Sequence, residues 1–114
     1  MKIVRASSPE DFGAILDYIH DRSYELNRLQ FDRDRQELRI PIQLGRKGLE
    51  GLLVIRNANA FSVRDDAQID EGDINTIEYE HALVVIKGAI PVDLTVAVSV
   101  LDIELVLPDN APLA

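Results

Sequence analysis

Apolar residues recur at helical spacing in one segment near the N-terminus. Ser8 and Pro9 suit a helix start, because serine can cap free backbone amides and proline fits the first helical position. The acidic residues that follow favour the positive end of the helix dipole. The next apolar residues share one face of a helix: Phe12, Ile15, Leu16 and Ile19. This pattern predicts a helix over residues 9–21.

Most of the remaining chain alternates between apolar and polar positions, which is typical of half-buried strands. The clearest strand is 37–44, whose even positions are all apolar. Pro41 has no N–H to donate, which favours a sheet edge or a bulge at that position. Residues 23–31 are predicted to be the hairpin partner of this strand, across the polar connection 32–35. Further strands are predicted at 2–6, 49–56, 60–65, 74–87 and 93–107.

The last two predicted strands change character along their length. In 93–107 the bulky residues occupy even positions up to Val100 and odd positions from Leu101 onward. Such a switch requires a bulge or a strand that passes between sheets. In 74–87 the even positions change from polar to apolar after Glu80, so we expect the second half to be buried on both faces. The chain is predicted to be one α+β domain over residues 1–114. Its N-terminal helix would pack on a curved, mainly antiparallel sheet or small sandwich of about six strands.

The same two strands bring acidic residues together if they form a hairpin about the turn 88–91. Residues whose numbers sum to about 180 would then lie opposite each other. Glu78 would face Asp102, Glu104 would lie further along, and Glu80 would share their face. Such a patch could bind a cation or a basic protein. The alternative is an ordinary exposed face whose charge is offset by arginines of neighbouring strands: Arg22, Arg39 or Arg56.

The histidines offer little catalytic chemistry. His81 has the parity of Tyr79 and Leu83, which would place it on the apolar face of its strand. There it could be a hydrogen-bonded core residue or an acid–base group. His20 suits the last turn of the helix. The chain has no nucleophile elbow, phosphate-binding loop or metalloprotease motif, so we assign no catalytic residue, metal ligand or cofactor.

Composition and charge indicate which classes of partner the protein is expected to bind. The 114-residue chain has no cysteine and no long apolar run, and we expect a cytoplasmic location without membrane contact. The formal net charge is −8, and residues 57–114 carry two basic and eleven acidic groups. This excess of negative charge disfavours binding to nucleic acid, which is itself negatively charged. The one basic segment, which includes the turn Gly45–Gly48 and its Arg46, has interleaved acids and no aromatic ladder.

Three functional hypotheses follow. The first is a non-enzymatic protein-interaction module, inhibitor-like, immunity-like or an accessory subunit, whose acidic sheet face binds a basic protein. The second is a metal-binding domain or small enzyme that uses the four carboxylates. The third is a self-associating domain, in which the final strand or the edge near Pro41 completes a homodimer.

Overall fold

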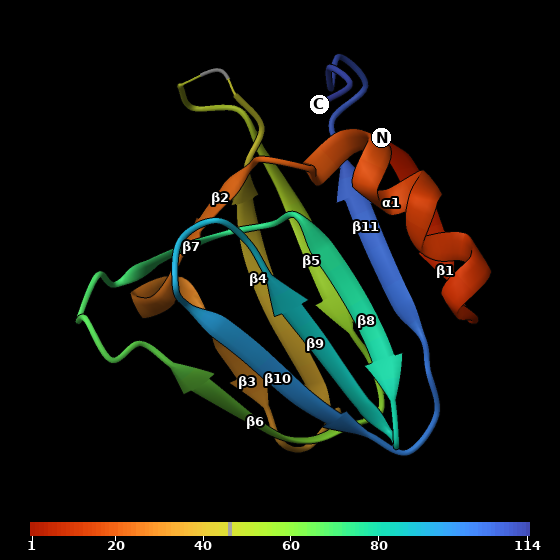
Figure 1. The fold of residues 1–114 in the computed structure, drawn as a ribbon. Coiled ribbons are helices and arrows are strands. Elements are labelled where there is room, and N and C mark those ends of the chain that lie inside the picture. Colours follow the sequence, from red (N-terminus) through yellow and green to blue (C-terminus); the bar gives the residue numbers. More distant parts are fainter. Residues whose placement is uncertain (46) are drawn as a thin grey trace.

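The computed structural model describes residues 1–45 and 47–114 and consists mostly of antiparallel sheet. In these residues eleven strands form three sheets, more than the roughly six strands predicted. The five-stranded sheet has the order β1 (Lys2–Ala6), β11 (Ile103–Leu107), β5 (Glu50–Ile55), β4 (Glu37–Gln43), β3 (Gln30–Asp32). The four-stranded sheet has the order β6 (Ala58–Arg64), β10 (Asp93–Val98), β9 (Leu83–Lys87), β8 (Thr76–Glu80). A small third sheet pairs β2 (Ser23–Glu25) with β7 (Glu71–Asp73) (Figure 1).

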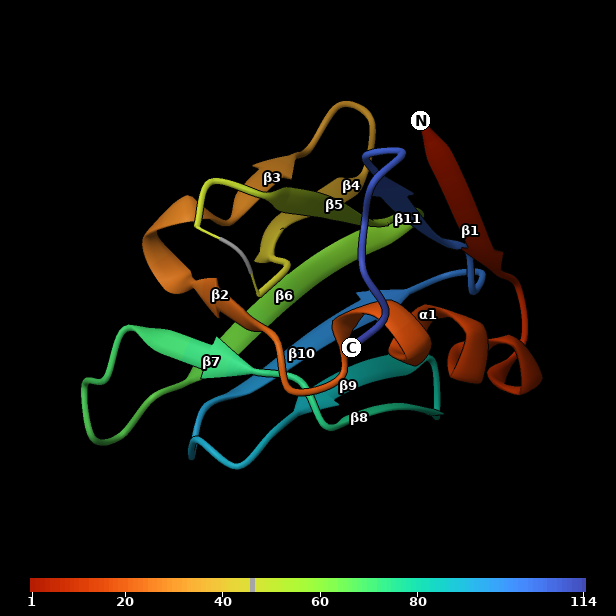
Figure 2. The same ribbon diagram turned by 90° about the horizontal axis from the view of Figure 1, so that it is seen from above.

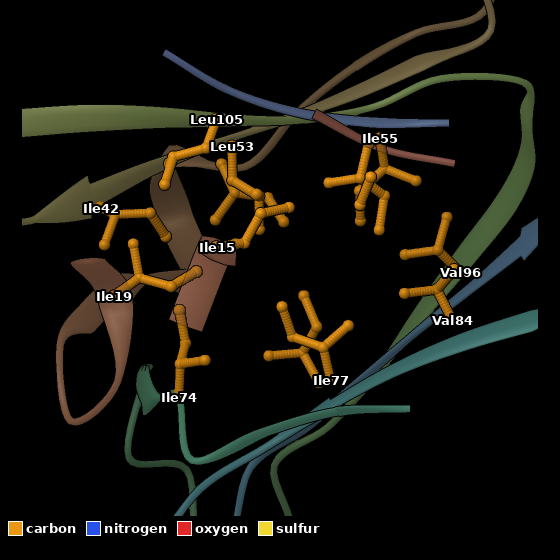
Figure 3. Close-up of a cluster of buried hydrophobic side chains, with 14 of the residues drawn as sticks. Ile15, Ile19, Ile42, Leu53, Ile55, Ile74, Ile77, Val84, Val96 and Leu105 are labelled. Atoms are coloured by element: carbon orange, nitrogen blue, oxygen red, sulfur yellow. The ribbon is translucent and has the colours of Figure 1, made fainter. Parts of the chain in front are cut away.

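The two larger sheets lie in separate layers that enclose the core (Figure 2). Alternation along each strand directs one set of apolar side chains inward. In Figure 3, Leu53 and Leu105 of the five-stranded sheet lie on one side of this core. Val84 and Val96 of the four-stranded sheet lie on the other side, and all four residues are fully buried. The core is therefore that of a small sandwich, which was one of the two predicted arrangements, the other being a single curved sheet.

The only α-helix among the described residues closes one side of the sandwich. A 3₁₀ turn, Pro9–Asp11, leads into α1 (Phe12–Ile19), which contacts the edge strands β1 and β8. The Asp11 carboxylate accepts hydrogen bonds from the backbone N–H groups of Ser7 and Ser8, at 3.0 and 3.3 Å. The helix ends at Ile19, before the predicted residue 21, because His20 leaves the helical conformation with a ψ of 133°. Asp21 then adopts a left-handed conformation (φ 63°) and donates its N–H to the carbonyl of Ile74. Within the described residues, no helix has the length and apolar character that crossing a membrane requires.

The change of face in 93–107 is confirmed as a passage between sheets. β10 belongs to the four-stranded sheet and β11 to the five-stranded sheet. The connection between them lies beside the crossing from β5 to β6: the Arg56 N–H donates to the carbonyl of Asp102, and the Ser99 N–H donates to that of Asn57. The β5–β6 and β10–β11 connections therefore pass side by side from one sheet to the other.

The segment 74–87 is two strands rather than one, so this prediction was wrong. His81 and Ala82 have φ values of 53° and 62°, the pair of positive values that a tight two-residue hairpin needs. The turn reverses the chain between β8 and β9 and changes which positions face inward. Ile77 is buried in β8, whereas Val84 and Ile86 are buried in β9. The odd positions of β9 face outward, so its predicted burial on both faces was also wrong.

The partner of the 37–44 strand is shorter than predicted. Only Gln30–Asp32 pairs with the start of β4, while Ser23–Glu25 pairs with β7 instead. Pro41 therefore has a partner in β5, Leu52, and none in β3, so proline occupies a stretch of β4 that is locally an edge. Arg46 of the basic turn lies outside the described residues.

Candidate protein-interaction surface

Glu78 and Glu80 lie on the exposed face of β8, at the rim of the four-stranded sheet. Their partners across the β8–β9 hairpin are Val85 and Leu83. Both glutamates are exposed, and alternation places them on the same side of the strand, as expected from the sequence. Within the described residues, neither carboxylate has a lysine or arginine nitrogen within 4.0 Å.

Two rows of side chains continue from these glutamates across the sheet. The first row is Glu78, Val85, Thr95 and Ser62, and the second is Glu80, Leu83, Ala97 and Ala60. We call these eight residues the β8–β6 face. Leu83 is 38% exposed. In Figure 1 no other element lies in front of β8, β9 and β10 on this side. The β8–β6 face is therefore an open, uncharged surface with two carboxylates along one margin.

Asp102 and Glu104 do not join this surface, which corrects the predicted patch of four carboxylates. The predicted register holds for β9 and β10, where Val84 faces Val96. This register does not extend to Glu78 and Asp102, because the chain reverses at His81 and the pairing of β9 with β10 stops at Leu83. Asp102 lies in the connection to β11, and Glu104 lies on β11 in the five-stranded sheet.

Glu104 is instead held by arginines of its own chain. Its Oε2 accepts a hydrogen bond from Nη1 of Arg56 at 3.0 Å and lies 3.3 Å from Nε of Arg5. The hydrogen bond from Arg56 lowers the pKa of the Glu104 carboxyl, although its burial opposes this shift. Arg56 therefore offsets this carboxylate, as the alternative required, but Arg56 follows β5 rather than belonging to it, and Glu104 is buried rather than exposed.

The other charges on the outer face of the five-stranded sheet are paired in the same way. Glu37 lies 3.1 Å from a guanidinium nitrogen of Arg39 and 3.6 Å from Nε of Arg56. Glu50 accepts hydrogen bonds from both Arg28 and Gln43, and the Arg28 bond lowers the pKa of the Glu50 carboxyl. These ion pairs satisfy the acids of this face internally, in contrast with Glu78 and Glu80.

The sequence predicted that His81 lies on the apolar face of a strand, and this prediction was wrong. His81 occupies the exposed β8–β9 turn, where its Nε2 lies 3.3 Å from Oε1 of Glu80. An exposed turn lacks the enclosure that tunes an acid–base group. Among residues 1–45 and 47–114, no three His, Cys, Asp or Glu side chains are placed to hold a metal ion. The hypothesis of a metal site or enzyme built on the four carboxylates thus loses the geometry on which it depended.

Sequence reasoning missed the uncharged part of the β8–β6 face. Leu83 and Val85 belong to the continuous apolar run 82–86, which we interpreted as burial on both sides. The structure covers only one side, so the outward residues of this run are exposed or half-buried. A continuous apolar run in a sheet with one uncovered face is the signal that could have identified them.

Comparison with protein families, with curated proteins and with solved structures gave no match.

Proposed function

We propose that this protein is a non-enzymatic interaction module that binds a basic partner protein through the β8–β6 face. The observation that carries this proposal is the contrast between the two outer faces. Carboxylates on the five-stranded sheet are paired with arginines, whereas Glu78 and Glu80 are exposed beside uncharged residues. An apolar centre with charge at its rim is the usual composition of a protein interface.

Charge complementarity defines the partner. The chain has a formal net charge of −8, so it attracts a cationic protein before contact and raises the rate of association. Lysines or arginines of the partner would meet Glu78 and Glu80, and an apolar patch would cover Leu83 and Val85. An inhibitor-like, immunity-like or accessory role would fit such a contact.

Capture of partners from the native host, compared between variants, tests this proposal. We expect Glu78→Lys with Glu80→Lys to reduce capture about tenfold or more, because like charges then oppose each other across the interface. The matched control is Asp17→Lys with Glu71→Lys, which makes the same charge change at exposed positions on α1 and β7. The control should retain the partner.

A third variant tests the apolar centre of the same face. Leu83→Asp places a carboxylate in the β8–β6 face without altering the core, and we expect it to abolish capture. Equal capture of the same partners by the wild type, the double lysine variant and Leu83→Asp would show that this face is not the binding surface.

Self-association is a second candidate, and one observation favours it. A row of apolar residues crosses the outer face of the five-stranded sheet: Ile3, Val106, Leu52 and Pro41. The final strand cannot pair through its edge, because β11 has neighbours on both sides. Light scattering after size-exclusion chromatography tests this candidate: a dimer that Leu52→Asp converts to monomer would support it, and a monomeric wild type would exclude it.

A further inference from the structure

The outermost strand of the four-stranded sheet, β6, has a free edge. It pairs with β10 on one side, and the sheet order gives it no neighbour on the other. In the described part of the chain, the backbone of residues 59–64 makes no hydrogen bond outside its pairing with β10. Figure 1 shows β6 at the rim of its sheet. Its outward N–H and C=O groups are therefore free to pair with another strand.

This edge lacks the protection that the other edges have. β8 carries Glu78 and Glu80, β1 carries Lys2 and Arg5 and contacts α1, and β3 is only three residues long. Charges and short length are the usual devices that prevent edge pairing. β6 has seven residues, of which only the last, Arg64, is charged. A bulge interrupts its pairing near Ala58, but the pairs from Ala60 to Arg64 are continuous.

A groove lies along this edge, between β6 and the turn that joins β3 to β4. One wall is formed by Phe31, Arg33 and Gln36, and the other by residues 58–61 of β6, around a volume of about 400 Å³. The Phe31 and Phe61 rings meet edge-to-face with centroids 5.5 Å apart. The Ala58 N–H donates to the Gln36 carbonyl at 2.8 Å and ties the start of β6 to the turn. The groove thus combines a free backbone edge with an aromatic surface.

Arg33 gives this groove a charge preference. Its side chain is exposed, and no carboxylate of the described residues lies within 4.0 Å of its guanidinium nitrogens. Arg35 of the same turn, in contrast, lies 3.9 Å from the Asp32 carboxylate. A carboxylate of an incoming segment could therefore pair with Arg33 without displacing an existing partner.

We propose that β6 binds an extended, carboxylate-bearing segment of a partner protein as an additional strand. Main-chain hydrogen bonds to residues 60–64 supply the pairing, apolar side chains pack on Phe31 and Phe61, and a carboxylate meets Arg33. A single strand fits the groove better than a second copy does, because a copy would bring a second β3–β4 turn and a second Arg33 to the same edge. This site shares Ala60 and Ser62 with the β8–β6 face, but its charged group, Arg33, lies at the β6 margin, whereas Glu78 and Glu80 lie at the β8 margin.

Short capped peptides test this proposal. The panel alternates valine and threonine and moves one glutamate through each position, and a matched panel has lysine in place of glutamate. Binding is followed by fluorescence anisotropy, and hydrogen–deuterium exchange locates it on the chain. We expect at least one glutamate peptide to slow the exchange of amides in 59–64 and to bind about tenfold more tightly than its lysine counterpart.

Two controls separate strand addition from simple adhesion. The best peptide with alternate amides N-methylated keeps its side chains but cannot pair as a strand, so it should not bind. Arg33→Glu should reverse the preference for glutamate over lysine, whereas Arg35→Glu, at a residue that does not line the groove, should leave it unchanged. Glu78→Lys with Glu80→Lys should also leave peptide binding unchanged, so this proposal and that for the β8–β6 face can fail separately.

Three outcomes would overturn the proposal. One is failure of every peptide in the panel to protect residues 59–64. Another is equal binding of the N-methylated and unmethylated peptides. The last is concentration-dependent protection of the same amides without peptide, accompanied by a dimeric mass, which would identify a second copy as the occupant of the edge.

Discussion

Arg56 Nη1 donates a hydrogen bond to Glu104 Oε2 at 3.0 Å, and this contact joins residues 48 positions apart in the chain. Glu104 is only 8% exposed although it lies on the outer face of its sheet, because Arg5 and Arg56 cover it. The acid that resembled part of a binding patch in the sequence is therefore part of the internal structure of the five-stranded sheet.

Loss of this pair should destabilise the fold. In Arg56→Met the Glu104 carboxylate keeps only Arg5, and we expect the free energy of unfolding to fall by about 1–2 kcal/mol, since the arginine is partly exposed. Urea denaturation measures the change. Glu78→Gln, on the exposed β8 margin, is the control and should stay within about 0.5 kcal/mol of the wild type. Equal stability of Arg56→Met and the wild type would contradict the structural role of the pair.

The stability of the protein should decrease in acid, in part because of Glu104 and Glu50. Hydrogen bonds from Arg56 and Arg28, respectively, lower the folded-state pKa of these carboxyls below their ordinary value of 4.5. The unfolded chain then binds protons at a higher pH than the folded chain does. Their contribution is fully present above about pH 4.5 and is lost as the pH falls through the lower folded-state values.

Unfolding midpoints measured across this acidic range test the assignment. Glu104→Gln cannot titrate at this position, so its stability should fall less steeply with pH than that of the wild type. Ser62→Ala, an exposed substitution that changes no titratable group, serves as the comparison and should show the wild-type slope. A Glu104→Gln slope identical to that of the wild type would mean that the pair is not formed in solution.

The β8–β9 turn can be stabilised by a single substitution. Ala82 has a φ of 62°, a conformation that costs a residue with a Cβ about 1–2 kcal/mol and glycine little. We expect Ala82→Gly to raise the melting temperature and to increase the free energy of unfolding by about 1 kcal/mol. Ala14→Gly, at an exposed position within α1, should instead lower stability by about 1 kcal/mol. A decrease in both variants would contradict the turn conformation.

Two glycines should respond in opposite ways to substitution by alanine. A Cβ at Gly72 would lie 2.5 Å from the ring of Tyr24, the buried residue of β2 that pairs with Gly72, whereas a Cβ at Gly13 would meet nothing within 4 Å. Gly72→Ala should therefore destabilise the protein by about 1–3 kcal/mol. Gly13→Ala should stabilise it by about 0.5–1 kcal/mol through helix propensity. Thermal unfolding of both variants compares the two, and a tolerated Gly72→Ala would show that Tyr24 is not packed there.

The sequence predicted the parts of the fold in which side-chain alternation is uninterrupted. The helix stripe from Phe12 to Ile19, the strand from Glu37 and the exchange of face after Val100 all depend on which positions must be buried. The pairing of Val84 with Val96 followed from the same rule. These features are local, or are fixed by a short turn, and so can be inferred from one sequence.

The candidate site could not be predicted as well, because it depends on a turn without the usual residues. His81 and Ala82 adopt positive φ values where glycine or asparagine is typical, so nothing in the sequence marked the reversal. The turn at His81 and Ala82 divides the predicted long strand into the β8–β9 hairpin, so Glu78 does not lie opposite Asp102. The free edge of β6 was missed for a different reason: strand order depends on long-range pairing, which alternation does not encode.

The position of β11 has a consequence for folding on the ribosome. This strand lies between β1 and β5, so the first strand of the chain has no sheet partner until residues 103–107 have left the exit tunnel. Earlier hairpins, such as β4 with β5, can form during synthesis, but β1 stays separate from the β5–β4–β3 part of the sheet until then. Such distant pairing is intrinsically slow to form. The five-stranded sheet is therefore complete only when β11 has inserted between β1 and β5.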